Sequence, residues 1–386
     1  MKLYCVPLVF LLSCAAAQSP LPQGATVEKI AGGFQFVEGP VWREGVGLLF
    51  SDLSANKAYR WTPETGAVVY LNPSGNSNGL AYDAQGRLLL AQTGFRRIAR
   101  RDSSGMVTSL AASYGGKKLN SPNDIAVKSD GSIFFTDPPF NIPLGQAKEL
   151  TFSGIFRISP SGTLQLLDST LSEPNGICFS PDETKLYVDN SSQRVIYVWD
   201  VLNDSTIANK RPFASMSLAG YADGMKVDAP GNVFCTGPLG IWVFTPDGAV
   251  IDTILVPGQT SNCNWGEPDG KTLYITSGSS VYRIRLETTD VKNHGWRPAD
   301  SDELSANYPN PFNPSTTIRF SLRKHSAAFL RLFDVLGREV TTWVNAEKPA
   351  GTYEIAFDAS NLAGGVYFYQ LKTGSFVQTR KMLLTK

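Results

Sequence analysis

The sequence predicts an all-β protein, a six-bladed β-propeller followed by a small Ig-like β-sandwich. Three observations support this. The 386 residues include 35 Gly, 24 Pro and 11% aromatic residues, a composition rich in turn and strand formers. One strand pattern recurs between residues 30 and 287, and a segment of different composition follows it.

Charge and histidine content narrow the possible functions. The formal net charge is +1, from 35 Lys+Arg against 34 Asp+Glu, which argues against a strongly basic nucleic-acid-binding protein. The chain has two histidines, His294 and His325, and both follow the repeated region. A Ser-His-Asp mechanism or a catalytic histidine pair within the repeats is therefore excluded.

The N-terminus resembles an export signal. Lys2 precedes an apolar run at 6–12, and Ala15 to Ala17 provides an A-x-A cleavage site, so residues 1–17 are predicted to be a signal peptide. The alternative is a lipoprotein in which Cys14 is lipidated. No later stretch is long enough for a transmembrane helix. Three cysteines without a C-x-x-C motif then remain, and we expect small buried side chains at Cys178, Cys235 and Cys263.

The repeat begins with a polar residue, then a small or turn-forming residue, then alternating apolar residues. A turn, a β run and a third strand follow, and the spacing of roughly 40 to 50 residues is typical of a β-propeller. Six third-strand segments predict six blades. The instances begin at Glu38-Gly39, Asn78-Gly79, Asn123-Asp124, Asn175-Gly176 and Asp223-Gly224, with a looser sixth at Asn264-Trp265-Gly266.

The repeat also predicts a site. The same position of each blade faces one central channel, so Glu38, Asn123, Asn175 and Asp223 are expected to converge at one mouth of it. Two carboxylates and two carboxamides suit a hard divalent cation, and Ca²⁺ is favoured over Zn²⁺. Two alternatives stay open: Asn-Gly and Asp-Gly form turns, and the ion could be purely structural.

At these residues the chain resembles the gluconolactonase family, which includes regucalcin (senescence marker protein). The resemblance covers about Ala31 to Glu287. It implies a six-bladed propeller with a divalent metal, Ca²⁺ or Zn²⁺, held by Glu38, Asn175 and Asp223. It also implies substrate contact and possible metal binding at Asn123, and a general base at Asp223. The segments that carry it begin at Val37, Leu119, Phe134, Glu173, Asp223 and Asp269.

The chain departs from the family pattern at two places. Gln92-Thr93 precedes Arg96 and Arg97 where relatives commonly have Glu-His, in a segment that often lines the substrate mouth. Glu267 stands where many relatives have Gly. Arg96 and Arg97 are candidate substrate-binding residues, and a solvated strand face is the alternative for both.

The expected activity is metal-dependent hydrolysis of a sugar lactone. The cation, Ca²⁺ with Zn²⁺ or Mg²⁺ as alternatives, would polarise the carbonyl, and Asp223 would activate water. Two other functions fit the same site: a phosphotriesterase-like hydrolase, and a non-catalytic binding propeller tied together by its ion.

The segment after Glu287 predicts a second domain. Residues 288–306 lack a strand pattern and are expected to form a linker, and residues 307–386 contain short strands separated by turns, typical of an Ig-like sandwich. This segment resembles the C-terminal sorting domain of type IX secretion substrates, through its Asn-Pro-Phe-Asn-Pro motif and the ending Lys381 to Leu384. The resemblance implies secretion or cell-surface attachment in a two-membrane bacterium, through the secretion machinery. An ordinary Ig-like accessory domain is the alternative.

Overall fold

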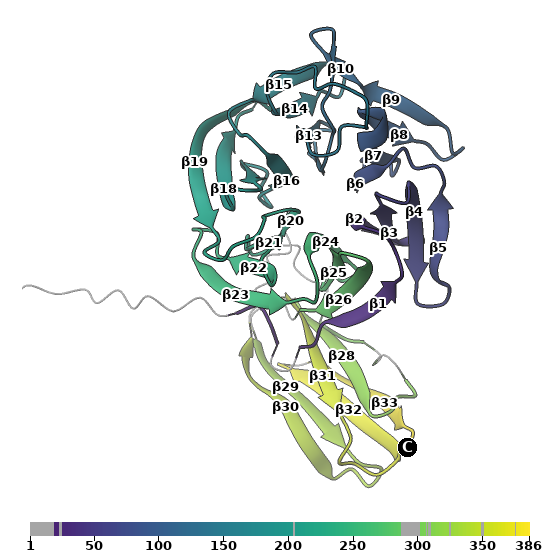
Figure 1. The fold of residues 1–386 in the computed structure, drawn as a ribbon. Helices are drawn as coiled ribbons and strands as arrows, with labels where there is room; N and C mark the ends of the chain where they lie inside the picture. The colour runs from purple at the N-terminus through teal and green to yellow at the C-terminus, as the bar shows by residue number, and fades with distance from the viewer. Residues whose placement is uncertain are drawn as a thin grey trace, which may run out of the picture. The chain divides into compact units, whose positions relative to one another are not determined.

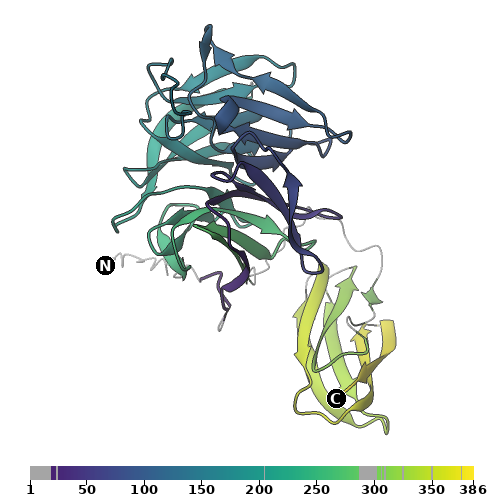
Figure 2. The ribbon, with the colours of Figure 1, turned by 45° about the vertical axis from the view of Figure 1, so that its right-hand side comes forward.

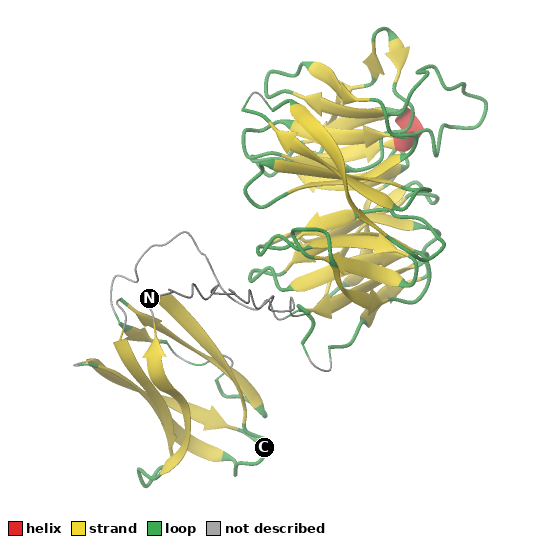
Figure 3. Ribbon diagram, turned by 90° about the vertical axis from the view of Figure 1, so that its left-hand side faces the viewer, coloured by secondary structure: helices red, strands yellow, loops and turns green. Residues whose placement is uncertain are grey.

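The computed structural model describes residues 19–22, 25–203, 205–286, 302–305, 307, 310–323, 326–348, 351–374 and 376–386. The predicted signal peptide, both histidines and most of the predicted linker lie outside these residues. The chain divides into two compact units, Met1–Asp290 and Val291–Lys386. Strands form nearly all regular structure, which confirms the all-β prediction, and the described helix is one 3-10 turn, η1 (Thr93–Phe95), red in Figure 3.

Six four-stranded antiparallel sheets make up the described part of the first unit, together with a two-stranded hairpin, β10 (Ser113–Tyr114) and β11 (Lys117–Lys118). The first three sheets are β2 (Val37–Arg43), β3 (Gly47–Asp52), β4 (Lys57–Thr62) and β5 (Gly66–Leu71); β6 (Ser77–Tyr82), β7 (Leu88–Gln92), β8 (Arg97–Arg101) and β9 (Val107–Ala111); and β12 (Ile125–Val127), β13 (Ile133–Asp137), β14 (Gly154–Ile158) and β15 (Leu164–Asp168).

The other three sheets repeat this order, and the last is completed by a strand from the beginning of the chain. They are β16 (Pro174–Phe179), β17 (Lys185–Asn190), β18 (Val195–Val201) and β19 (Ile207–Ser215); β20 (Met225–Val227), β21 (Val233–Gly237), β22 (Gly240–Phe244) and β23 (Val250–Leu255); and β24 (Thr260–Gly266), β25 (Thr272–Ser277), β26 (Ser280–Arg285) and β1 (Glu28–Gly32).

The sheets are arranged in a ring, with the first strand of each nearest the centre (Figure 1). The pairing of β1 with β26 closes the ring, because it joins the two ends of this unit in one sheet. The second strands are the apolar runs of the repeat. β7, β13 and β21 are buried along their whole length, since a neighbouring sheet covers each face. Apolar clusters fill the gaps between sheets, such as the one that joins Leu89 and Ile98 to Ile125 and Phe135.

The second unit consists of two sheets, green and yellow in Figure 2, of three and four strands in the described residues. Their inward side chains share one core, which includes Ile318, Phe320, Leu330, Tyr369 and Met382. The sheets are β27 (Glu303–Leu304), β28 (Ser315–Leu322) and β31 (Gly351–Asp358), and β30 (Glu339–Lys348), β29 (Ser326–Phe333), β32 (Gly365–Thr373) and β33 (Phe376–Leu384).

β27 differs from the sequence prediction, which places residues 303–306 in the linker. Leu304 pairs with Phe320 of β28, and its side chain is fully buried in the core of the second unit. A two-residue strand is too short to show alternation in sequence, so only its tertiary contacts reveal it. The described chain has no helix that is both long and apolar enough to cross a bilayer.

Candidate functional site

The predicted site residues lie at one end of the ring because strand pairing puts them there. The start of each inner strand pairs with the end of the second strand: Val37 with Asp52, Ser77 with Gln92, and Pro174 with Asn190. The residue that follows each of these starting positions therefore lies at this end of the ring. Asn123 and Asp223 precede β12 and β20, but their backbone N–H groups donate to Thr136 O and Thr236 O near the ends of the second strands, which places them at the same end. We call this set the mouth ring: Glu38, Asn78, Asn123, Asn175, Asp223 and Ser261.

Hydrogen bonds between neighbouring sheets hold the mouth ring in place. The Gly79 N–H donates to Asn123 O at 2.7 Å, the Gly176 N–H to Asp223 O at 3.2 Å, and the Gly224 N–H to Ser261 O at 2.7 Å. Second-strand hydroxyls reinforce this pattern, since Thr136 Oγ1 donates to Asn175 O at 2.6 Å. These hydrogen bonds between the sheets thus fix the backbone of the ring.

The sixth member of the ring corrects the sequence assignment. Thr260 pairs with Ser277, as Val37 pairs with Asp52, so Ser261-Asn262 occupies the position assigned to Asn264-Trp265-Gly266. Asn264 lies farther along β24, where its Nδ2 donates to Pro40 O at 2.8 Å. The assignment failed because this repeat has Asn262 where most others have glycine, whereas Asn264 lies just before a Trp-Gly pair that resembles the motif.

The two ring carboxyls lie close to one another, with Glu38 buried and Asp223 half-buried. Burial raises the pKa of Glu38 to about 8, and the neighbouring Asp124 adds to the rise, against a hydrogen bond from the Gly39 N–H at 2.9 Å. Burial also raises the pKa of Asp223 well above its usual range, and repulsion from Glu38 is the next cause. Asn175 donates a hydrogen bond to Asp223. Two carboxyls in this arrangement favour a bound cation or a shared proton.

The orphaned oxygens of the mouth ring test whether its residues fit a cation. Asn175 Oδ1 and Asn78 Oδ1 are both buried, and neither has a hydrogen-bond partner in the described part of the chain. A buried carboxamide oxygen without a partner is costly, and a cation would satisfy it. The described residues contain no group of three or more His, Cys, Asp or Glu side chains suited to a metal.

Asn123 is the remaining predicted residue at the mouth. The Asn123 side chain is buried. Its backbone N–H donates to Thr136 O at 2.9 Å, which fixes the backbone beside the channel. The structure therefore brings Glu38, Asn123, Asn175 and Asp223 to one end of the ring.

Arg96 and Arg97 have structural partners instead. Arg96 is 2% exposed, its Nε donates to Leu119 O at 2.7 Å, and its Nη1 donates to Gln146 Oε1 at 3.2 Å. Arg97 Nε donates to Gln92 Oε1 at 2.6 Å, and the guanidinium lies over the Phe95 ring. Arg96 is thus not on a solvated strand face, and both arginines bond to other parts of the chain, while their contact with substrate stays a prediction.

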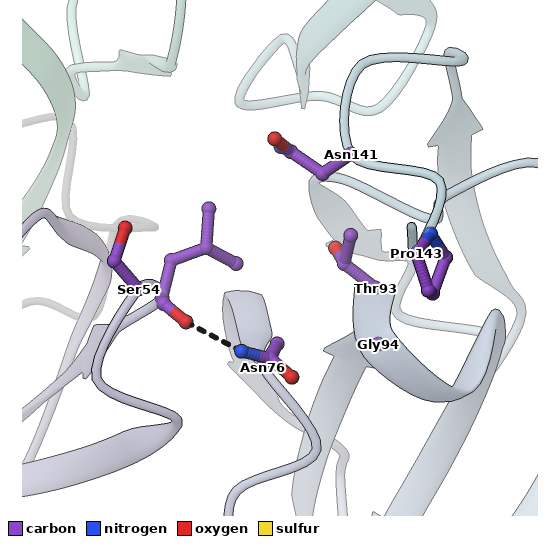
Figure 4. A pocket seen from close by; sticks show the side chains of 7 residues that line it. Ser54, Asn76, Thr93, Gly94, Asn141 and Pro143 are labelled. Carbon is purple, nitrogen blue, oxygen red and sulfur yellow. Dashed lines mark hydrogen bonds between the residues drawn. The ribbon is translucent and has the colours of Figure 1, made fainter. Parts of the chain in front are cut away.

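A pocket of about 270 Å³ lies at the same end of the ring, over the first three sheets. Figure 4 shows Asn76 and Ser54 on one side, with Thr93, Asn141 and Pro143 on the other. Thr93 Oγ1 donates to Pro122 O at 2.9 Å, so the pocket wall adjoins the segment that carries Asn123. None of the lining residues is charged; they are Leu53, Ser54, Asn76, Thr93, Gly94, Asn141 and Pro143.

The two departures from the family pattern lie at opposite ends of the ring. Thr93 lines the pocket, so the Gln92-Thr93 segment lies at the mouth. Glu267 lies in the turn between β24 and β25, at the far end, where it accepts a hydrogen bond from Tyr274.

The three cysteines Cys178, Cys235 and Cys263 are buried and form no disulfide among the described residues, as expected.

A ring of antiparallel sheets, with carboxyl and carboxamide side chains gathered at one end, is the architecture of a propeller protein. Residues 36–279 match the family model of the SMP-30/Gluconolactonase/LRE-like region, and the chain belongs to that family. Residues 306–385 match the secretion system C-terminal sorting domain. Both resemblances drawn from the sequence are confirmed.

Individual relatives agree with this membership. A gluconolactonase from Zymomonas mobilis is 39% identical over 291 residues, which are 68% of this chain and 82% of that protein. Regucalcin from Xenopus laevis is 27% identical over 252 residues, 63% of this chain and 83% of that protein. The solved structure of a gluconolactonase from Xanthomonas campestris is 34% identical, covers 68% of this chain and 89% of its own, and has a TM-score of 0.64.

Proposed function

We propose that this protein is an exported, metal-dependent lactonase that hydrolyses a neutral sugar lactone. The observation that carries the proposal is the mouth ring itself. Its two mutually repelling carboxyls and the orphaned Asn175 Oδ1 gather where a cation would relieve both costs. The names of the relatives, gluconolactonase among them, support the reaction class.

Glu38, Asn175 and Asp223 would hold the cation, with Asn123 as a fourth ligand or a substrate contact. Oxygen donors without histidine or cysteine favour Ca²⁺, with Zn²⁺ and Mg²⁺ as alternatives. When bound, the cation would supply polarisation of the lactone carbonyl and stabilisation of the oxyanion.

Asp223 would accept the proton of the attacking water, because its carboxyl lies beside Glu38 and Asn175, where the cation would be held. The water oxygen bonds to the carbonyl carbon, the ring C–O bond breaks, and the proton passes from Asp223 to the departing alkoxide. The product is the open hydroxy acid. Asn123 would hold a substrate hydroxyl during these steps.

The pocket beside Asn123 supports the substrate class. Its polar groups are the hydroxyls of Ser54 and Thr93 and the carboxamides of Asn76 and Asn141, which suit the hydroxyls of a sugar. None of the lining residues is charged, so the pocket has no positively charged side chain to bind a phosphate or sulfonate group. A neutral polyhydroxylated lactone therefore fits better than an anionic one.

We further propose that the six sheets are the six blades of a β-propeller, and that the C-terminal unit is an Ig-like sandwich acting as an export address. The match of residues 306–385 to a sorting domain supports secretion. The order of parts is then a signal peptide at 1–17, the propeller at 30–287, a linker, and the sorting domain.

Glucono-δ-lactone hydrolysis by purified protein, measured with chelator and after Ca²⁺ is restored, tests the proposal. We expect turnover that chelator abolishes and Ca²⁺ restores. Turnover insensitive to chelator would overturn the metal mechanism. Absence of turnover on a panel of neutral lactones, with melting temperature still raised by Ca²⁺, would instead support a binding propeller. The same assay with a phosphotriester as substrate tests the alternative function, a phosphotriesterase-like hydrolase.

A further inference from the structure

A second layer of side chains lies one residue deeper along the inner strands than the mouth ring. Four strands have glycine there, and two have side chains that reach across the axis, Asp124 and Asn262. Asn262 Nδ2 donates to Asp124 Oδ2 at 3.4 Å, although the two residues belong to the third and sixth sheets. The four glycines are Gly39, Gly79, Gly176 and Gly224.

The glycines make room for these two side chains. A Cβ atom on Gly79 would lie 2.7 Å from Asp124 Oδ1, and one on Gly224 would collide with the Asn262 carboxamide. Asp124 and Asn262 are each only 2% exposed. The channel is therefore filled by polar side chains directly beneath the mouth ring.

Lys226 adds a positive charge to this layer. Its Nζ lies 3.8 Å from Asp124 Oδ2 and donates to Met225 O at 2.9 Å, and 19% of its side chain is exposed. Asp124 Oδ1 also accepts from the Ile125 N–H at 2.9 Å. The buried carboxylate is thus paired with an ammonium and bonded at both oxygens, as a stable buried ion pair requires.

Asn262 connects this pair to the mouth ring. The Cys263 N–H donates to Asn262 Oδ1 at 2.9 Å, which fixes the carboxamide so that its NH₂ group points toward the axis. That NH₂ group bonds to Asp124 and also donates to Glu38. One carboxamide therefore bridges the buried ion pair and a candidate metal ligand.

We propose that Lys226 is a positioning residue for the metal site, acting through Asp124 and Asn262 on Glu38. This inference rests on the proposed function. Lys226 offsets the negative charge of Asp124, which repels Glu38, and keeps Asn262 shared between the two carboxylates. Glu38 and Asp223 then remain the pair of carboxylates directed at the cation. Outer residues of this kind orient ligands and tune their affinity.

The test is a double-mutant cycle on the full chain, with the dissociation constant for Ca²⁺ measured by calorimetry and the melting temperature measured alongside. Lys226→Met leaves Asp124 charged and unpaired, and Asp124→Asn leaves an unpaired ammonium that can turn to Glu38. We expect each single variant to bind Ca²⁺ about tenfold or more weakly. The double variant, which restores neutrality, should return to within about threefold of wild type.

The alternative outcomes are distinct. A purely structural pair would lower the melting temperature in both single variants without changing Ca²⁺ affinity, and this would overturn the inference. Tighter Ca²⁺ binding by Lys226→Met would also overturn it, because Lys226 would then merely repel the cation. Should Lys226→Met not fold, Asn262→Ala supplies the same test: weaker binding supports the bridge and unchanged binding overturns it. Wild-type protein that binds no divalent cation would overturn the proposed function as well.

Discussion

At the scale of single residues, Asn175 tests the ligand set most directly. Its Nδ2 group has partners in Asp223 and Ser191, whereas its buried Oδ1 has none in the described chain. We expect Asn175→Ala to weaken Ca²⁺ binding by about tenfold or more and to remove most turnover, with the melting temperature of the chelated protein nearly unchanged. Calorimetric Ca²⁺ titration and a lactonase assay measure both effects.

Asn264→Ala is the matched control for this variant. It removes the same side chain from an inner strand, but from a carboxamide that donates to Pro40 O and lies outside the mouth ring. It should lower stability without changing Ca²⁺ affinity. Normal activity of Asn175→Ala at limiting Ca²⁺ would contradict the ligand assignment.

Asp223 combines two proposed roles that a single substitution separates. Asp223→Asn keeps an oxygen donor but loses the charge and the basic site. We expect turnover to fall by about 100-fold or more, the usual contribution of a general base, while Ca²⁺ occupancy at saturating metal persists. Metal analysis of the assayed sample provides the comparison. Occupancy that falls in step with the rate would show that Asp223 is a ligand alone and that the base lies elsewhere.

Asp137 predicts how stability depends on pH. It is fully buried, with Oδ2 accepting from the Asn120 N–H at 2.7 Å, and burial raises its pKa to about 7 from 3.8. Between about pH 4 and pH 7, the folded protein therefore keeps the Asp137 proton, whereas the unfolded chain has already lost it. This group's stabilising contribution is complete below about pH 4 and is lost as pH rises through 7.

Asp137→Asn should remove that pH-dependent component. As pH rises from 5 to 8, we expect the melting temperature of wild type to fall relative to that of the variant. Thermal melts at both pH values, with chelator present throughout, measure the shift. A constant difference would show that Asp137 has an ordinary pKa.

At the scale of elements, β1 is the strand on which closure of the ring depends. It pairs with β26 from Glu28↔Arg283 to Gly32↔Ser280, and Ile30 and Ala31 pack on the core between the sixth and first sheets. Deleting residues 18–32 should expose β26 as a sheet edge and the apolar core beside it. We expect a large fall in melting temperature and aggregation on size-exclusion chromatography.

Glu28→Ala is the control for this deletion. It removes only the exposed ion pair with Arg283, in which Arg283 Nε lies 2.7 Å from Glu28 Oε2, and such pairs contribute less than about 1 kcal/mol. The melting temperature should change little. If the deletion lowered the melting temperature as little as Glu28→Ala does, the ring would not depend on β1.

At the scale of the whole molecule, the proposed functions divide between the two units. Every proposed ligand lies in the first unit, and the second has its own apolar core, which begins with Leu304. Truncation after residue 300 removes that core entirely and leaves the propeller intact. We expect the truncated protein to keep near-normal Ca²⁺ binding and lactonase turnover, but to stay in the periplasm of its native host.

Fractionation of host cells that express the full or truncated chain measures this, with activity assayed in each fraction. Full-length protein is the control for surface or medium delivery. Truncated protein that still reaches the surface or medium would contradict the sorting role. Loss of activity in the purified truncation would contradict the independence of the propeller.

Local patterns in the sequence determined much of this protein. Composition and the recurring strand motif predicted the all-β fold, and equal positions within the repeat brought Glu38, Asn123, Asn175 and Asp223 to one end of the ring. Such predictions succeed because inward-facing positions recur with the strand period in each repeat. The apolar second strands were equally clear, since burial on both faces demands continuous apolar runs.

Contacts between distant segments decided the rest. Ser261 occupies the sixth ring position, and β1, from the other end of the unit, closes the ring. Arg96 is buried because its guanidinium bonds to carbonyls of a later segment. The Asp124–Lys226 pair joins residues about 100 positions apart and has no local signature. A sequence pattern records which side of its own strand a residue faces. Only the closed ring determines which residues meet across its axis, because that depends on how all the sheets pack together.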